Sequence, residues 1–213
     1  MNNNYSAQQL RTILAKLQGL DYIKPEDIPN IELYMDQVTT FMDEHLASTK
    51  RYDTDKILTK TMINNYAKND LLPPPVKKKY SKEHMLLLVF IYYFKGVLSI
   101  TDIQNLLTPL TEKYFNSTSG MNLQDIYNEV FGFEQAQADK LVRDILGEYK
   151  KAFTSFSDAD EEEQEFLHLF SFICMLSFDV YVKKLLIEKL IDDMPKKDTK
   201  KEKDKDKNKK AKP

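Results

Sequence analysis

Apolar residues recur at spacings of three and four along most of the chain, and this period constrains the fold more than any other feature. Near the N-terminus, Leu10, Ile13, Leu14 and Leu17 form one helical stripe, with Ser6 as its expected cap. Only 5 of the 213 residues are glycine, which argues against β-sandwiches and against α/β enzymes that bind phosphate in glycine-rich loops. We therefore expect an all-α protein.

Polar and proline-containing segments separate the expected helices. Helices are predicted over residues 6–20, 31–45, 59–69, 81–94, 99–109, 123–131, 134–156 and 159–194. Ser81 and Ser99 are the expected N-caps of their helices, Pro109 is expected to end one helix, and Gly147 is expected to interrupt another.

Four regions follow from this pattern. We expect an N-terminal amphipathic helix and connector over residues 1–30, a middle unit over 31–108, a C-terminal helical region over 109–194, and a tail over 195–213. The tail alternates lysine with acidic residues and has almost no apolar residue to bury, so it is predicted to be disordered.

Charge is unevenly distributed, although the net charge is only −2. The tail carries ten lysines against four acids. A second basic stretch, residues 49–82, holds nine lysines and arginines against three acids. The rest of the chain is therefore acidic, and a polyanionic partner is expected to meet the 49–82 stretch.

The sequence lacks the usual signatures of an active site. His45, His84 and His168 lie far apart, and with a single cysteine they make no zinc-binding spacing. Phosphate-binding glycine loops and the nucleophile-elbow motif are also missing. We expect no enzyme activity, no catalytic residue, no metal and no cofactor.

One cysteine permits no intrachain disulfide, and the N-terminus shows no secretion signal, so a cytoplasmic location is expected. The apolar runs 85–94 and 166–182 are short for a bilayer. Both are predicted to be buried core helices, with Cys174 packed in the second, and no membrane partner is expected.

The strongest functional signal lies in residues 36–107. The short helix 59–69 has an apolar side with Ile63 and Tyr66, and a polar side that carries Lys60, Thr61, Asn64, Asn65 and Lys68. Leu71-Leu72-Pro73-Pro74-Pro75 ends this helix and precedes a predicted β-turn, or wing, over residues 76–80 that carries Lys77, Lys78 and Lys79.

This order of elements resembles the DNA-binding domain of the MerR family. The matching residues are 59–66, Lys68, Leu71-Leu72-Pro73, Lys79-Tyr80-Ser81 and 99–107. More closely, residues 5–185 are similar to an uncharacterised bacterial family known as a domain of unknown function, thought to be related to MerR-type regulators. The resemblance implies a winged helix-turn-helix with a small β wing over residues 31–108, followed by a C-terminal helical bundle.

Three departures from the MerR pattern stand out. A long loop, residues 45–58, replaces the tight turn between the first two helices. Asn69-Asp70 stands where MerR proteins usually have glycine, although Asn and Asp tolerate left-handed geometry. Asn64-Asn65 occupies positions where that family often has Arg-Tyr, and asparagine pairs with adenine edges.

We therefore expect a transcriptional regulator that binds double-stranded DNA in a sequence-specific manner. The expected DNA contacts are Lys60, Thr61, Asn64, Asn65 and Lys68 on the helix, Lys77, Lys78, Lys79 and Tyr80 in the wing, and Ser81 at the next helix start. The alternative for the lysines is an ordinary solvated surface.

The apolar C-terminal helices leave two possibilities open. The resemblance implies a homodimer through these helices, and packing within one chain is the alternative. A helical protein-interaction adaptor that keeps the winged-helix scaffold without binding DNA is the alternative function, with a protein partner in place of DNA.

Overall fold

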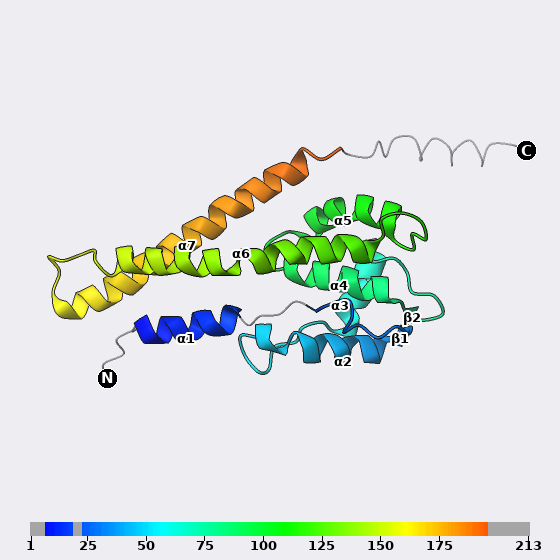
Figure 1. Cartoon of the computed structure of the whole chain (residues 1–213), viewed down its shortest axis with the longest axis horizontal. Coiled ribbons are helices and arrows are strands. Elements are labelled where there is room, and N and C mark those ends of the chain that lie inside the picture. Colours follow the sequence, from blue (N-terminus) through cyan, green and yellow to red (C-terminus); the bar gives the residue numbers. More distant parts are fainter. Residues whose placement is uncertain (1–6, 19–22, 196–213) are drawn as a thin grey trace, which may run out of the picture.

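The computed structural model describes residues 7–18 and 23–195, and the expected cap Ser6 and the predicted tail from residue 196 onward lie outside them. Within the described residues the chain forms eight helices and one small antiparallel sheet (Figure 1). In chain order the elements are α1 (Ala7–Gln18), β1 (Leu33–Tyr34), α2 (Met35–His45), the 3-10 helix η1 (Ala47–Thr49), α3 (Lys60–Lys68), β2 (Lys79–Tyr80), α4 (Lys82–Phe94), α5 (Ile100–Tyr114), α6 (Leu123–Ala152) and α7 (Glu161–Asp192).

The main core surrounds α4. Every α4 residue from His84 to Ile91 is buried, because the neighbouring elements cover the helix on all sides. The core runs from Ile23 to Phe131 and includes one residue of α7, Ile191. Tyr127 of α6 joins its two ends, since its hydroxyl donates a hydrogen bond of 2.7 Å to the Ile23 carbonyl. Residues 23–131 therefore form one packed unit.

A second, smaller core lies at the other end of the molecule, where α1 runs beside α6 and α7 crosses it (Figure 1). Its buried members are Leu10 and Leu14 of α1, Ala152 of α6 and Phe172 of α7. The apolar stripe predicted for the first helix thus faces α6 and α7, with Ile13 at its exposed edge. The long helix α6 connects the two cores.

Predicted helix limits are wrong in three elements, α5, α6 and α2. The α5 helix continues through Pro109 to Tyr114. Proline has no N–H, so the Asn105 carbonyl receives no helical hydrogen bond from position 109. Asn105 and Pro109 are both exposed, so water can hydrogen-bond to this carbonyl instead. The α6 helix is continuous across Gly132 and Gly147, since a glycine costs a helix only about 1 kcal/mol.

The third wrong boundary is the start of α2. We expected this helix from residue 31, but it begins at Met35, because Leu33 and Tyr34 are extended and pair with β2. Strand pairing is a contact with residues more than forty positions away, so helical periodicity carries no sign of it.

The apolar surface of α7 also departs from expectation. The run 85–94 is a core helix as predicted, but the run 166–182 is largely exposed, and so is Cys174. Large apolar side chains of α7 that remain exposed are Phe166, Phe170, Ile173, Phe178, Val180, Tyr181, Val182, Leu185, Leu186, Ile187 and Leu190. Packing among the described residues therefore leaves this side of α7 uncovered. Among the described helices, none is long and apolar enough to cross a bilayer.

Candidate nucleic-acid interface

The α3 helix is held by its apolar side and presents its polar side to solvent. The Thr59 side chain caps it by accepting a hydrogen bond of 3.2 Å from the Met62 backbone N–H. Ile63 and Tyr66 are buried, as predicted. The five expected contact residues of this helix, Lys60, Thr61, Asn64, Asn65 and Lys68, are all exposed. They share the face that a major-groove helix would turn toward base edges.

The end of α3 is a Schellman motif without glycine. Asp70 adopts a left-handed conformation with φ of 55°, and the Leu71 N–H donates a hydrogen bond of 2.9 Å to the Tyr66 carbonyl. Leu71 and Tyr66 are both buried, which supplies the apolar contact that accompanies this motif. Of the pair Asn69-Asp70, it is therefore Asp70 that takes the left-handed position usually given to glycine.

The predicted wing is a tight turn joined to a short strand. Lys77 and Lys78 have φ values of 49° and 63°, and the Lys79 N–H donates a hydrogen bond of 2.9 Å to the Val76 carbonyl. Positive φ at both central positions is the geometry of a type I′ turn. The Lys77 and Lys78 side chains are exposed at its tip.

Tyr80 does not belong to the exposed surface, contrary to our prediction. In the sheet Leu33 pairs with Tyr80 and Tyr34 pairs with Lys79. Side chains alternate along a strand, so Tyr80 points inward with Leu33 while Lys79 points outward with Tyr34. Tyr80 is only 3% exposed, and its side chain is part of the core.

Ser81 begins α4 as predicted, and its partner is His84. The Ser81 N–H donates a hydrogen bond of 3.0 Å to His84 Nδ1, and the two side chains lie 2.8 Å apart. His84 is buried, with its ring edge-on to Tyr80 and Phe115. Burial lowers the pKa of His84, because the charged ring would lose its hydration. The Ser81 hydroxyl, expected to bind phosphate, is thus already engaged.

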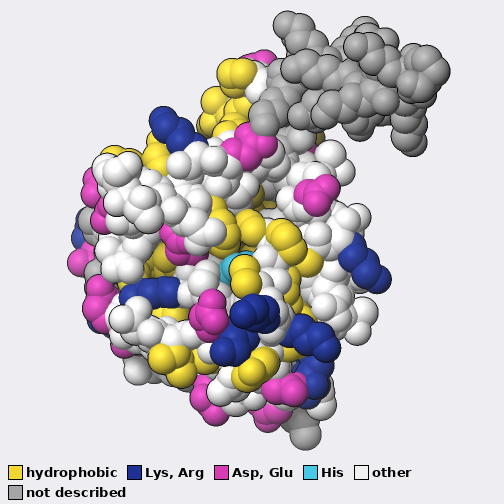
Figure 2. Space-filling view, turned by 90° about the vertical axis from the view of Figure 1, so that its right-hand side faces the viewer, with side chains coloured by type: hydrophobic (Ala, Val, Ile, Leu, Met, Phe, Trp, Pro, Cys, Tyr) yellow, Lys and Arg dark blue, Asp and Glu magenta, His cyan; other side chains and the backbone are white. Residues whose placement is uncertain are grey.

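Two of the expected DNA-binding lysines have acidic neighbours. Lys60 forms an ion pair with Asp36 at the start of α2, and Lys79 lies 3.9 Å from Glu32. Figure 2 faces the end of the molecule that carries the sheet, and lysine and arginine side chains gather on it with acidic side chains between them. No spacing in the sequence pointed to Asp36 or Glu32, because these contacts join separate elements.

Lys68, Lys77 and Lys78 remain as exposed cations with no ion pair among the described residues. The polar side of α3 and the exposed lysine turn are thus both supported by the main core. Elsewhere in the part of the chain that the structure describes, no three His, Cys, Asp or Glu side chains come together as a metal site.

Comparison with known proteins gives a family but no activity. No curated protein and no solved structure matches the chain. The family model of a domain of unknown function, DUF1836, matches residues 23–130. These limits coincide almost residue for residue with the main core, which runs from Ile23 to Phe131. They include α3 and the lysine turn, and leave out α1, the second half of α6 and α7. The chain is therefore a member of the DUF1836 family.

Proposed function

We propose that this protein is a transcriptional regulator that binds double-stranded DNA through a MerR-like winged helix-turn-helix, with α2 and α3 as the helix pair and residues 76–80 as the wing. The main support for this proposal is that α3 has two distinct sides. Ile63 and Tyr66 are buried on one side, and amide, hydroxyl and lysine side chains are exposed on the other. A recognition helix needs both sides, because the buried side fixes the direction in which the polar side chains point.

Different residues would do different work on DNA. Asn64 and Asn65 would read base edges, since asparagine forms paired hydrogen bonds with adenine. Lys77 and Lys78 would contact phosphates and add affinity for any duplex. Lys60 and Lys79 would contribute less, because Asp36 and Glu32 already offset their charge.

The exposed apolar side chains of α7 support a homodimer. A helix of 32 residues is about 48 Å long, which is enough for an extended seam between two copies. Operators with two-fold symmetry require a protein with the same symmetry. We propose that two copies of α7 cover each other and thereby set the spacing of the two α3 helices.

Selection from sheared genomic DNA of the source organism tests the proposal. The purified full chain should enrich a few palindromic sites, and its affinity for them should fall steeply with salt. Asn64→Ala with Asn65→Ala should reduce the preference for these sites over random duplex by about 10-fold or more, because a bidentate contact is worth about 1–3 kcal/mol of discrimination.

The lysine turn requires a variant that keeps its geometry. Lys77→Asn with Lys78→Gly places the residues that a type I′ turn favours at those positions and removes two charges. The slope of log affinity against log salt should become shallower by about 2 per protomer, with the site preference retained. The matched control, Lys150→Ala with Lys151→Ala, removes two exposed charges at the far end of α6 and should leave the slope unchanged.

The alternative function is a protein-interaction adaptor, and the same α7 surface favours it. In this case the chain would be a monomer by light scattering, would enrich no DNA site at low or moderate salt, and would bind one protein in fixed stoichiometry. Phe178→Glu with Leu186→Glu should release that protein, since both side chains are mostly exposed on α7. A dimer that enriches palindromic sites would contradict the adaptor.

A further inference from the structure

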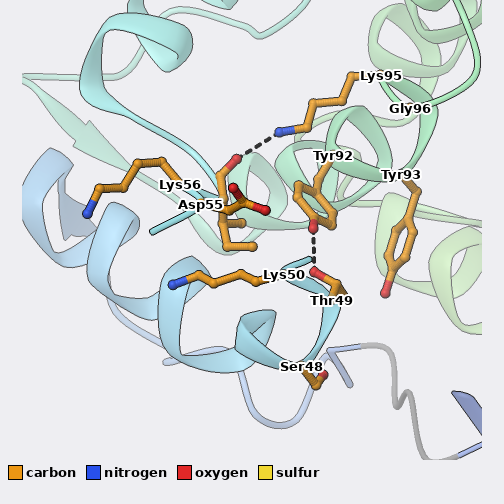
Figure 3. Close-up of a pocket in the computed structure, with 10 residues that line it drawn as sticks. Ser48, Thr49, Lys50, Asp55, Lys56, Tyr92, Tyr93, Lys95 and Gly96 are labelled. Carbon is orange, nitrogen blue, oxygen red and sulfur yellow. Dashed lines mark hydrogen bonds between the residues drawn. The ribbon is translucent and has the colours of Figure 1, made fainter. Parts of the chain in front are cut away.

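A cavity of about 680 Å³ lies between the loop that leads into α3 and the end of α4 (Figure 3). One wall consists of residues between Ser48 and Ile57, and the other of residues between Tyr92 and Gly96. We call it the Lys95 pocket. Its volume is in the range of small-molecule sites, and its lining combines tyrosine rings with charged side chains.

Lys95 supplies the charge that defines this pocket. Its half-buried ammonium group donates a hydrogen bond of 2.7 Å to the Ile57 carbonyl and lies 4.5 Å from the centre of the Tyr92 ring. One carboxylate, Asp55, lines the pocket, but it accepts a hydrogen bond of 3.0 Å from the Tyr52 N–H, and no carboxylate among the described residues lies within ion-pair distance of Lys95. Burial lowers the pKa of Lys95, because the ammonium group has lost part of its hydration.

The other lysines of the lining differ from Lys95. Lys50 is paired with Asp43 at 2.9 Å, and its hydrogen bond holds the pKa of Asp43 below the usual value. Lys56 is exposed, and its side chain extends away from Lys95 (Figure 3). Lys95 is therefore the partly desolvated cation whose described partners, a carbonyl and a ring, are both neutral. Its ammonium has three N–H donors and uses one on Ile57, so donors remain for an anion.

The pocket also connects the loop to α3. The Thr49 hydroxyl donates to the Leu46 carbonyl at 2.7 Å and is hydrogen-bonded to the Tyr92 hydroxyl. Together with the bond from Lys95 to Ile57, this contact ties the loop to α4. Ile57 is buried and precedes the α3 cap Thr59 by two residues. A molecule that bridges the two walls would therefore hold the start of α3.

We propose that the Lys95 pocket binds a small organic oxyanion, a carboxylate or a phosphate ester, whose charged group accepts hydrogen bonds from Lys95 and whose remainder lies against the tyrosine rings. The cavity is far larger than a bare oxyanion requires, which is why an organic ligand fits it better. Binding of this oxyanion in the Lys95 pocket stabilises residues 46–58 and the start of α3. The proposal stands whether or not the protein binds DNA, since each of its tests is made without DNA.

Thermal unfolding of the full chain tests the proposal with three probes: inorganic phosphate, citrate and adenosine monophosphate, each compared with sodium chloride at equal ionic strength. At least one probe should raise Tm by about 3–5 °C at ten times its Kd. Lys95→Met keeps most of the side-chain length without the charge and should remove this shift. The control Lys150→Met, on an exposed lysine at the far end of α6, should retain it.

Hydrogen exchange of the wild-type protein gives a second measurement that does not depend on any variant. The active probe should slow exchange in residues 46–58 and 92–98 more than elsewhere. A response to phosphate and adenosine monophosphate identifies a phosphate ester, and a response to citrate alone identifies a carboxylate. No Tm shift with any probe, a full shift in folded Lys95→Met, or protection confined to other segments overturns the proposal.

Discussion

Replacing His84 should change how the stability of this protein depends on pH. Within the described residues, His84 is the buried polar residue of the main core, and its Nδ1 accepts a hydrogen bond from the Ser81 N–H at the start of α4. His84→Phe keeps an aromatic ring between Tyr80 and Phe115 but removes the acceptor. Loss of this cap should lower the free energy of unfolding at pH 7.5 by about 1–2 kcal/mol.

The sign of the pH effect follows from burial. Desolvation is the largest influence and lowers the pKa of His84, while the nearby carbonyls of Pro73 and Pro74 and the charge of Glu32 oppose it. The unfolded chain binds a proton near pH 6.5, whereas the folded chain does not until a lower pH. The contribution of His84 is therefore complete above about pH 6.5 and is lost as the pH falls toward the folded pKa. One proton limits the slope to about 1.4 kcal/mol per pH unit.

Urea unfolding followed by circular dichroism at several pH values between 7.5 and 5.5 measures this slope. His84→Phe should be less stable than wild type at pH 7.5, and the difference should shrink as the pH falls. The control Lys150→Gln replaces an exposed residue at the far end of α6 and should keep the wild-type slope between these pH values. If His84→Phe retained the wild-type slope over this range, the argument from burial would be wrong.

Three further changes in stability follow from the structure, each measurable by urea unfolding. Asp70→Gly should stabilise the protein by about 0.5–1 kcal/mol, because glycine adopts φ of 55° without strain, whereas Asp70→Val should destabilise it; equal stability of the two variants would refute this. Gly147→Ala should stabilise α6 by about 0.5–1 kcal/mol, since no neighbouring atom lies within 4 Å of the added methyl group, and a loss of stability would show that the site is crowded. Tyr127→Phe should cost about 1–3 kcal/mol by leaving the buried Ile23 carbonyl without its donor, and an unchanged free energy of unfolding would contradict this.

Much of the local structure was predictable because it depends on residues close together in the chain. The apolar spacing of Ile63 and Tyr66 was enough to assign the buried and exposed sides of α3. Ser99 caps α5 by accepting a hydrogen bond from the Asp102 N–H, as expected of a serine before a helix. Asp70 was predicted to tolerate left-handed geometry for a similar reason, since its short polar side chain reduces the steric cost.

Other features depended on distant residues and were decided by the tertiary structure. Pairing with Leu33 places Tyr80 in the core, although it follows three lysines, of which Lys77 and Lys78 are exposed. Asp36 and Glu32 lie outside the segment 59–81 and approach Lys60 and Lys79 from elsewhere in the chain, so the net positive charge of this surface is smaller than the sequence suggests. The Lys95 pocket arises where a loop meets the end of a helix almost forty residues later.

The sequence by itself determined an α-helical chain, the limits of α3, and a lysine turn after a proline stop, because helix period, capping and turn chemistry act over a few residues. Only the tertiary structure decided which apolar residues are buried by other parts of the same chain. The run 85–94 became the centre of the core, while the longer apolar run 166–182 stayed largely exposed on α7. Apolar residues in a sequence indicate that a surface is favourably removed from water. The arrangement of the other helices determines whether the same chain buries it.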